Sequence, residues 1–209
     1  MTEGRSAHVM RGPQDLGPGD VGRGDCSSTT RRSSTAYIGL GANLGERLPA
    51  LRHARLRIGD LGAVRATSPV YETAPVGFLD QPPFLNAALR LTTTLGPDEL
   101  MSNLLQIERD LGRVRTFPNA PRALDLDLLV YDDAVLDLTD LVVPHPRLHE
   151  RAFVLVPLND IAPDLLHPNL AVSVGDLLKR LGPVTDVHLT PLSLVDISDD
   201  ERSVLTDHS

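Results

Sequence analysis

The residues best suited to chemistry are two aspartates in the stretch Arg122-Ala123-Leu124-Asp125-Leu126-Asp127-Leu128. Side chains alternate between the two faces of a β-strand, so a strand here places Asp125 and Asp127 on one face and the leucines on the other, toward a core. Adjacent carboxylates repel each other and resist desolvation. Divalent cations such as Mg²⁺ relieve this repulsion and bind carboxylate and phosphate oxygens together. The stretch is interpreted as a metal platform for phosphoryl chemistry, and a solvated strand with two acids is the alternative.

Basic residues are close to these acids in the sequence: Arg113, Arg115 and Arg122 precede Asp127, and Arg147 and Arg151 follow it. The planar guanidinium group forms paired hydrogen bonds with phosphate. Metals on the acids and arginines around them could together hold a polyphosphate; arginines that pair with the surplus acids of the chain are the alternative. His145, between two prolines, is predicted to donate a hydrogen bond to phosphate. A zinc site with His149 is disfavoured because no cysteine lies nearby.

Two phenylalanines could bind a flat heterocycle. Phe84 opens an apolar run that is predicted to be a strand, and Phe153 interrupts a segment aimed at the same region. Aromatic rings can sandwich such a ligand, and Asn86, on the same strand face as Phe84, offers an amide donor and acceptor to its edge. The alternative is that both rings belong to the hydrophobic core.

The composition excludes several classes of protein. The chain has 209 residues, 41% of them hydrophobic, and a net charge of −8. These values fit one globular domain with tails and argue against a general nucleic-acid binder. Lys179 is the single lysine and stands outside any P-loop motif, which excludes a P-loop enzyme. One cysteine, Cys26, rules out a disulfide framework. No long apolar run and no secretory signal are visible, so a cytoplasmic protein without membrane spans is expected.

The hydrophobic periodicity predicts alternating strands and helices. Strands are expected over 36–41, 64–72 and 84–94 and in the stretch that carries the acids, and helices over 46–61, 97–111, 151–161 and 176–181. The order β-α-β-β-α-β predicts an α+β protein of the ferredoxin-like class. Its antiparallel sheet is expected to be covered by helices on one side, with extra C-terminal helical and strand elements.

The chain is predicted to have three parts. Residues 1–34 are rich in Gly, Ser, Arg and Asp, and we expect a disordered N-terminal extension because they offer little apolar surface to bury. Residues 35–185 are expected to form the folded domain, and residues 186–209 a polar C-terminal tail.

A series of short motifs resembles the 6-hydroxymethyl-7,8-dihydropterin pyrophosphokinase family of folate biosynthesis. In chain order they are Gly41-Ala42-Asn43-Leu44-Gly45, Ser68-Pro69-Val70-Tyr71-Glu72-Thr73, Asp80-Gln81-Pro82 with Phe84-Leu85-Asn86, Gly112-Arg113-Val114-Arg115, Pro121-Arg122-Ala123-Leu124-Asp125-Leu126-Asp127, and Val143-Pro144-His145-Pro146 with Arg151-Ala152-Phe153. They occur in family order across about residues 36 to 168, and the series makes the resemblance specific where a single motif would not.

The resemblance implies a ferredoxin-like fold and transfer of diphosphate from ATP to the hydroxymethyl oxygen of the pterin, with release of AMP. It implies two Mg²⁺ ions on the acids and a role for Asp127 in deprotonating the hydroxyl. The implied catalytic residues are Asp125, Asp127, Arg113 and Arg122. The implied pterin-binding residues are Thr73, Ala74, Pro75, Val76, Phe84, Asn86 and Phe153. The implied ATP-binding residues are Glu108, Arg113, Arg115, Arg122, Leu128, His145 and Arg151.

The sequence departs from the family in the loop before the acids. Many members carry Arg-Trp-Gly-Pro-Arg there, whereas this chain has the shorter Phe117-Pro118-Asn119-Ala120-Pro121-Arg122 and no tryptophan. Phe117 could close over the site instead. Leu105 stands where some relatives have a polar contact to adenine.

The expected partners are ATP and the hydroxymethyl pterin, without nucleic acid or membrane. A monomer is expected, with contact to other folate-pathway enzymes as an option. Two other functions are kept open. Another Mg²⁺-dependent D-x-D phospho- or nucleotidyltransferase would not require Phe84, Asn86 and Phe153, and a non-catalytic ferredoxin-like ligand-binding module would tolerate the loss of both aspartates.

Overall fold

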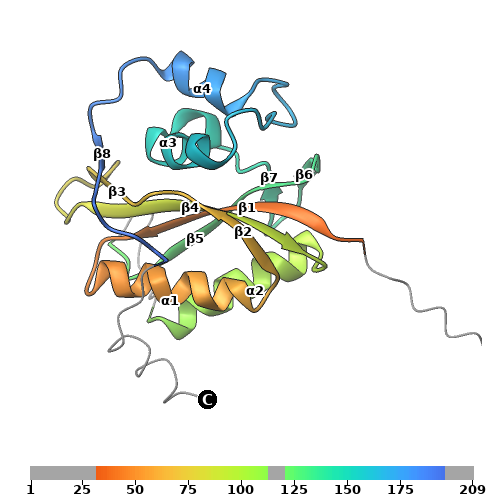
Figure 1. Ribbon diagram of the computed structural model, residues 1–209, viewed down its shortest axis with the longest axis horizontal. Coiled ribbons are helices and arrows are strands. Elements are labelled where there is room, and N and C mark those ends of the chain that lie inside the picture. The colour runs from red at the N-terminus through yellow and green to blue at the C-terminus, as the bar shows by residue number, and fades with distance from the viewer. Residues whose placement is uncertain (1–31, 113–120, 196–209) are drawn as a thin grey trace, which may run out of the picture. The chain divides into compact units, whose positions relative to one another are not determined.

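An antiparallel sheet forms the centre of the protein, whose computed structural model describes residues 32–112 and 121–195. Its strands are β1 (Ser34–Ala42), β2 (Ala63–Thr67), β3 (Tyr71–Thr73), β4 (Phe84–Thr93), β5 (Asp125–Tyr131) and β8 (Val187–Leu189). The strand order is β5-β1-β4-β3-β8, and β2 also pairs with β4 (Figure 1). β1 therefore lies between the strand that carries the two aspartates and the strand that carries Phe84 and Asn86.

Two helices cover one face of this sheet. Helix α1 (Arg47–Gly59) buries Leu51, Ala54 and Ile58, which recur at helical spacing. Helix α2 (Pro97–Asp110) has proline in its first turn and acids that suit the positive end of the helix dipole. Both helices lie below the sheet in Figure 1, and their buried side chains join the sheet in the larger hydrophobic core. The predicted start of α2 at Pro97 is confirmed.

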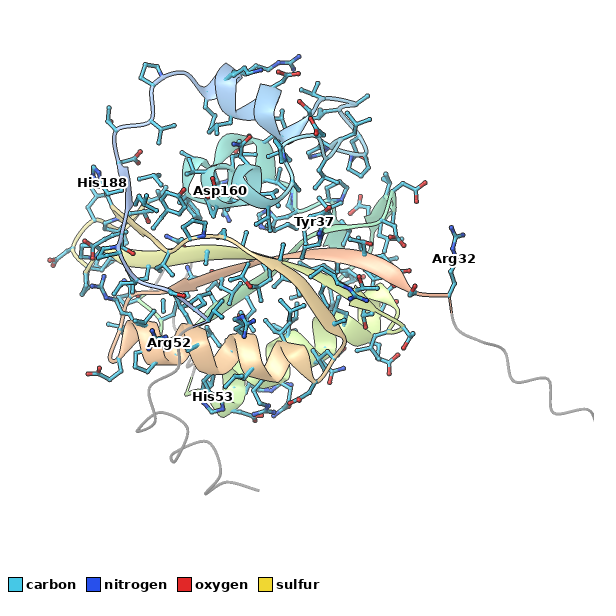
Figure 2. All side chains as sticks on the ribbon, in the orientation of Figure 1. Arg32, Tyr37, Arg52, His53, Asp160 and His188 are labelled. Carbon is cyan, nitrogen blue, oxygen red and sulfur yellow. The ribbon has the colours of Figure 1, made fainter. Side chains whose placement is uncertain are left out.

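Helices also cover the opposite face, which corrects the expectation of helices on one side only. Helix α3 (Ala152–Ile161) and helix α4 (Val174–Leu181) lie above the sheet in Figure 1, and a short 3-10 helix, η1 (Leu148–Glu150), leads into α3. They pack on Tyr37, Ala88 and Leu129 in a second core, and Tyr37 is labelled in Figure 2. β1 and β4 bury residues on both faces, so their sequences lack the clean alternation that marks an uncovered face.

The alternation predicted for β5 is present. Leu124, Leu126 and Leu128 are buried in the larger core, and Asp125 and Asp127 point to the other face. Full burial of a leucine stabilises a fold by roughly 1.5–3 kcal/mol. Three such leucines hold β5 in the register that presents both acids on the α3 side of the sheet.

The strand expected over 64–72 is two strands. β2 ends at Thr67 and β3 begins at Tyr71, with Ser68, Pro69 and Val70 between them. Pro69 has no N–H to continue a ladder, and the Ser68 hydroxyl accepts a hydrogen bond from the backbone N–H of Ala88 at 2.9 Å. Both strands pair antiparallel with β4, in keeping with the predicted antiparallel sheet.

The C-terminal boundary also differs from the prediction of a tail from residue 186. β8 pairs with β3, Leu194 is buried in the larger core, and Arg52 donates to the carbonyl of Ser193 at 2.9 Å. Residues 187–195 therefore belong to the folded unit. A strand of three residues with little burial gives almost no periodic signal, which explains the difference. Residues 1–31 and 196–209, which hold most of the predicted extension and tail, lie outside the described residues.

A small hairpin follows β5. Asp132 and Asp133 form a turn, and β6 (Leu136–Asp137) pairs antiparallel with β7 (Val142–Val143). Over residues 32–112 and 121–195, no helix combines the length and the apolar character that crossing a bilayer requires.

Candidate active site

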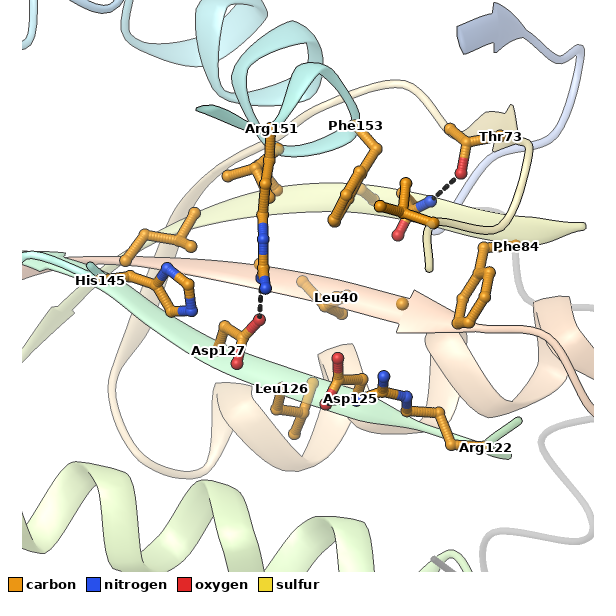
Figure 3. A pocket seen from close by; sticks show the side chains of 18 of the residues that line it. Leu40, Thr73, Phe84, Arg122, Asp125, Leu126, Asp127, His145, Arg151 and Phe153 are labelled. Carbon is orange, nitrogen blue, oxygen red and sulfur yellow. Dashed lines mark hydrogen bonds and ion pairs between the residues drawn. The ribbon is translucent and has the colours of Figure 1, made fainter. Parts of the chain in front are cut away.

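A cavity of about 500 Å³ opens between α3 and the sheet, over β5, β1 and β4 (Figure 3). Charged, aromatic and small side chains line it, and they come from elements far apart in the sequence. The residues implied for catalysis, pterin binding or ATP binding that line it are Thr73, Ala74, Val76, Phe84, Asn86, Glu108, Arg122, Asp125, Asp127, His145, Arg151 and Phe153. The fold thus gathers most of the residues predicted for two ligands around one hollow.

The two aspartates each have an arginine partner. Arg122 Nη1 lies 2.9 Å from Asp125 Oδ1, and Arg151 Nη1 lies 3.9 Å from Asp127 Oδ2, the contact drawn in Figure 3. Arg122 precedes β5, whereas Arg151 stands at the start of α3, so the two guanidinium groups reach the acids from different elements. Their charges offset the repulsion between the carboxylates.

Burial raises the pKa of Asp127 to about 7, and the charge of Asp125 adds to the rise, while Arg151 and Arg122 oppose it. Near neutral pH this carboxyl group therefore exchanges a proton readily. A divalent cation would displace that proton, because a metal ligand of this kind must be ionised.

The donor set suits a hard cation that shares its ligands with a substrate. Asp125 and Asp127 offer carboxylate oxygens on one strand face beside an open cavity. Among the described residues, no group of three or more His, Cys, Asp or Glu side chains is placed to hold a metal by protein ligands alone. Phosphate oxygens would complete the coordination, so the site fits Mg²⁺ only together with a phosphorylated ligand.

The raised pKa of Asp127 predicts that Asp127→Asn gains stability over the wild type as pH rises. Between about pH 4 and pH 7 the folded wild type holds a proton that the unfolded chain has released, and this stabilisation is lost as pH rises through 7. Asparagine has no such group. We expect the free energy of unfolding of the variant to rise relative to the wild type by about 1–3 kcal/mol between pH 4 and pH 8. The Asp127 side chain is 31% exposed, and solvent screening keeps the effect in this range.

Urea unfolding across this pH range, with EDTA and no nucleotide, measures the difference. His145, whose pKa is lowered to about 4 by burial and by Arg151, titrates in both proteins and largely cancels. A stability difference that stays constant with pH would contradict the perturbed titration of Asp127.

Arg122 has an unused buried donor. Its Nε has no hydrogen-bond partner among the described residues, and its Cζ lies 6.0 Å from the centre of the Phe84 ring. A buried donor without a partner costs about 1–3 kcal/mol. A phosphate oxygen at this position would remove that cost, so the structure supports an anion beside Arg122.

His145 is set up as a neutral donor. Its Nδ1 accepts a hydrogen bond from the backbone N–H of Arg147 at 3.2 Å, so the neutral ring carries its proton on Nε2. The lowered pKa keeps the ring neutral at pH 7. Glu108, also predicted for the site, is buried and accepts from the backbone N–H of Leu126 at 2.7 Å.

Phe84 and Phe153 border the cavity from different elements, β4 and α3 (Figure 3). Arg151 Cζ lies 5.5 Å from the centre of the Phe153 ring. Asn86 also lines the cavity and is buried, and its Nδ2 donates to Thr73 Oγ1 at 2.7 Å. This bond fixes the orientation of the amide. The rings of Phe84 and Phe153 and the amide of Asn86 together form one wall of the cavity, with two ring faces and one oriented polar group.

Gly41 forms the cavity floor between the amide and the first acid. In the sheet it lies opposite Asn86 on one side and Asp125 on the other. A Cβ at this position would lie 3.0 Å from Asn86 Oδ1, 3.8 Å from Asp125 Cβ and 3.9 Å from Phe84 Cδ1. The sequence named Gly41 only within a family motif and did not predict it as a site residue. A glycine within a strand is the signal of close approach that could have found it.

Asn43 does not line the cavity, but it holds segments that do, and the sequence did not predict this role. It is buried, its Oδ1 accepts from the backbone N–H of Arg122 at 2.8 Å, and its Nδ2 donates to Gln81 Oε1 at 2.9 Å and to the Pro82 carbonyl at 3.1 Å. It joins the end of β1 to the segments that precede β4 and β5. Nothing in the local sequence reveals these distant partners.

Some predicted site residues do not reach the cavity. The Leu128 side chain is 3% exposed and lies in the larger core, because it shares a strand face with Leu124, so it does not line the cavity. Pro75 does not line the cavity, although Ala74 and Val76 on either side of it do. Leu105, noted for its departure from relatives, is among the lining residues. Arg113, Arg115 and Phe117 lie outside the described residues.

Fold and cavity together define an α+β protein whose site joins an acid–arginine cluster, suited to polyphosphate and a hard cation, to a wall suited to a flat heterocycle. Residues 37–163 match the model of the 7,8-dihydro-6-hydroxymethylpterin-pyrophosphokinase (HPPK) family. The chain belongs to this family.

Relatives and solved structures agree with the match. A Haemophilus influenzae protein named 2-amino-4-hydroxy-6-hydroxymethyldihydropteridine pyrophosphokinase is 38% identical over 159 residues, which cover 75% of this chain and 99% of that protein. The folic acid synthesis protein FOL1 of Dictyostelium discoideum is 35% identical over 159 residues, covering 76% of this chain and 24% of that protein. The chain thus spans about a quarter of the length of FOL1. A crystal structure of Plasmodium falciparum HPPK-DHPS A437G has a TM-score of 0.58 at 16% identity, covering 73% of this chain and 46% of that chain, and shows the same fold.

Proposed function

We propose that this protein transfers diphosphate from ATP to the hydroxymethyl oxygen of 6-hydroxymethyl-7,8-dihydropterin, giving AMP and the pterin diphosphate. The observation that carries the proposal is one cavity in which Asp125, Asp127 and their arginines adjoin the wall of Phe84, Asn86 and Phe153. A transferase of another D-x-D kind would not need that wall, and a non-catalytic binding module would not need the acids. Family membership favours the pyrophosphokinase over both.

We assign the sheet and its first two helices to the ferredoxin-like class. The strand order β5-β1-β4-β3 supports this, with β2 and β3 together as one interrupted strand. Helix α1 follows β1, and α2 connects β4 to β5, as that class requires. On this reading α3, α4 and β8 are additions that close the second face of the sheet.

In the proposed reaction, the hydroxymethyl oxygen forms a bond to the β-phosphorus. The bond from that phosphorus to the oxygen shared with the α-phosphate breaks, and AMP leaves with that oxygen. Asp127 accepts the proton of the hydroxyl group and later releases it to solvent. Arg122 and Arg151 compensate the charge that grows on the departing oxygen. His145 donates from Nε2 to a phosphate oxygen.

Asp125 and Asp127 are proposed to hold Mg²⁺, as two ions shared with the phosphates. The cations would neutralise phosphate charge and polarise the reacting phosphoryl group. In that state the two arginines exchange their contacts with the carboxylates for contacts with phosphate oxygens.

The pterin ring is proposed to lie between Phe84 and Phe153. Asn86 and the backbone from Thr73 to Val76 read its polar edge. We further propose a cytoplasmic monomer that acts in folate synthesis without a nucleic-acid or membrane partner. A P. falciparum protein that joins HPPK to DHPS supports contact with another folate enzyme.

One assay tests the proposal. The protein is mixed with ATP, Mg²⁺ and hydroxymethyldihydropterin, and AMP and pterin diphosphate are measured by chromatography. We expect both products in equal amounts. AMP no higher than in a control without pterin would overturn the proposed function.

Gly41→Ala is expected to weaken pterin binding. The added methyl group would lie 3.0 Å from Asn86 Oδ1 and displace the amide or the ligand. We expect the KM for the pterin to rise about tenfold, a cost of about 1.4 kcal/mol, with a smaller change in the KM for ATP. Steady-state kinetics with each substrate varied in turn measures both.

Gly59→Ala is the matched control for this prediction. Gly59 ends α1, and a Cβ there would meet nothing within 4 Å. Both KM values should remain unchanged in the control. A similar effect of both alanine variants would contradict a specific role of Gly41.

A further inference from the structure

A hydrogen bond outside the cavity connects the far end of α3 to the sheet. The hydroxyl of Tyr71 on β3 donates to Oδ2 of Asp160 at 2.7 Å, across 89 positions of sequence. Tyr71 is 9% exposed, and Asp160, labelled on α3 in Figure 2, lies at the surface. Burial raises the pKa of Tyr71 to about 12, and the Asp160 carboxylate adds to the rise, so the hydroxyl keeps its proton for this bond. Neither residue lines the cavity.

The bond makes α3 a helix that is attached to the sheet at both ends. At its start, Arg151 pairs with Asp127 on β5; near its end, Asp160 accepts from Tyr71 on β3. Strands β1 and β4 lie between β5 and β3, so α3 spans the strands that form the cavity floor. Phe153 lies between the two attachments and points into the cavity (Figure 3).

The middle of α3 is the weakest part of this helix. Pro157 stands inside it and has no N–H to donate to the carbonyl of Phe153. A helix with a missing backbone bond bends more easily at that point. The contact at Asp160 therefore constrains a helix whose own backbone holds Phe153 less firmly than an uninterrupted ladder would.

Tyr71 is also adjacent to the opposite wall of the cavity. It lies directly opposite Asn86 in the β3–β4 pairing, and such partners share a sheet face. One side chain thus contacts both structures that border the heterocycle subsite: the strand that presents Asn86 and the helix that presents Phe153.

We propose that Tyr71 and Asp160 are positioning residues that set the distance between Phe153 on α3 and Asn86 on β4. This distance determines how well the pterin ring fits into the cavity. The proposal rests on the proposed function for the identity of the ligand. The Tyr71–Asp160 bond is expected to change the affinity for the pterin. It should have little effect on the affinity for ATP, because the proposed ATP contacts lie at the other end of α3.

The test compares Tyr71→Phe, Asp160→Ala, Asp160→Asn and the double variant Tyr71→Phe/Asp160→Ala. Loss of one hydrogen bond to a charged group is expected to raise the KM for the pterin about five- to tenfold in Tyr71→Phe and Asp160→Ala. The KM for ATP should stay within about twofold. Asp160→Asn keeps an acceptor and should restore a value near that of the wild type, and the double variant should equal either single variant because the two changes remove the same bond.

Tyr131→Phe is the matched control. Tyr131 is also 9% exposed, and its hydroxyl donates to the carbonyl of Leu95 at 2.7 Å, away from the cavity. Its loss should lower the melting temperature in a similar way and leave both KM values unchanged. Equal rises in both KM values, additive effects in the double variant, or the same pterin effect in Tyr131→Phe would overturn the positioning role.

Equilibrium binding of the pterin, followed by its fluorescence, is measured beside turnover. If the wild type binds pterin but releases no AMP, the proposed function fails, and the ratio of Kd values between variants and wild type still decides the positioning role. If the wild type does not bind pterin at all, both proposals are overturned.

Discussion

Asp127→Asn is expected to lower kcat by about 10³-fold, because it removes both a carboxylate ligand and the proposed acceptor of the hydroxyl proton. The variant keeps the shape of the side chain. It is also expected to be at least as stable as the wild type at neutral pH, since the wild type carries a desolvated carboxylate there. Loss of activity in a folded protein would therefore report on chemistry. Single-turnover measurement of AMP release, with ATP and Mg²⁺ saturating, gives the rate.

Asp137→Asn is the control for this loss. Asp137 is an exposed aspartate of β6, remote from the cavity lining, and its replacement should leave kcat unchanged. Near-full turnover of Asp127→Asn in the presence of Mg²⁺ would refute the metal platform on β5.

Arg122→Gln is expected to lower kcat/KM for ATP by about 10²–10³-fold. The change leaves Asp125 without its partner at 2.9 Å and removes the buried Nε donor. The repulsion between the two carboxylates is then less compensated, and a bound phosphate loses the paired hydrogen bonds of the planar guanidinium group. Arg122→Lys keeps the charge and loses the fork, so an intermediate value is expected. Steady-state kinetics with varied ATP at saturating pterin measures each variant.

Arg65→Gln controls for loss of a positive charge. Arg65 is exposed on β2, outside the cavity lining, and its variant should match the wild type. Wild-type kinetics in Arg122→Lys would show that a point charge suffices and would contradict the role given to the guanidinium fork.

The sequence alone determined the parts of the site that depend on one strand. The alternation of Asp125 and Asp127 with leucines gave the face of each side chain, because the period of two is a property of the strand backbone. The start of α2 followed in the same way from Pro97 and its acidic first turn. The series of motifs pointed to the family that the comparison with known proteins shows.

Leu128 shows what a list of implied residues leaves open. The resemblance implies a place in the ATP site for it, and the same alternation that orients the acids puts its side chain in the core. The division of the strand expected over 64–72 has a similar origin. The side chain of Ser68 bonds to the backbone of Ala88, a partner that the local pattern does not contain.

Only the tertiary structure decided which residues meet across the cavity. The order β5-β1-β4-β3 places Gly41 between Asn86 and Asp125, and the packing of α3 on the second face brings Arg151 to Asp127. These contacts join residues that are tens of positions apart. Periodicity reports how a segment presents its own side chains, whereas strand order and register determine which distant segment they face. The sequence therefore determined the acids and their orientation, and the fold determined the partners that make them a site.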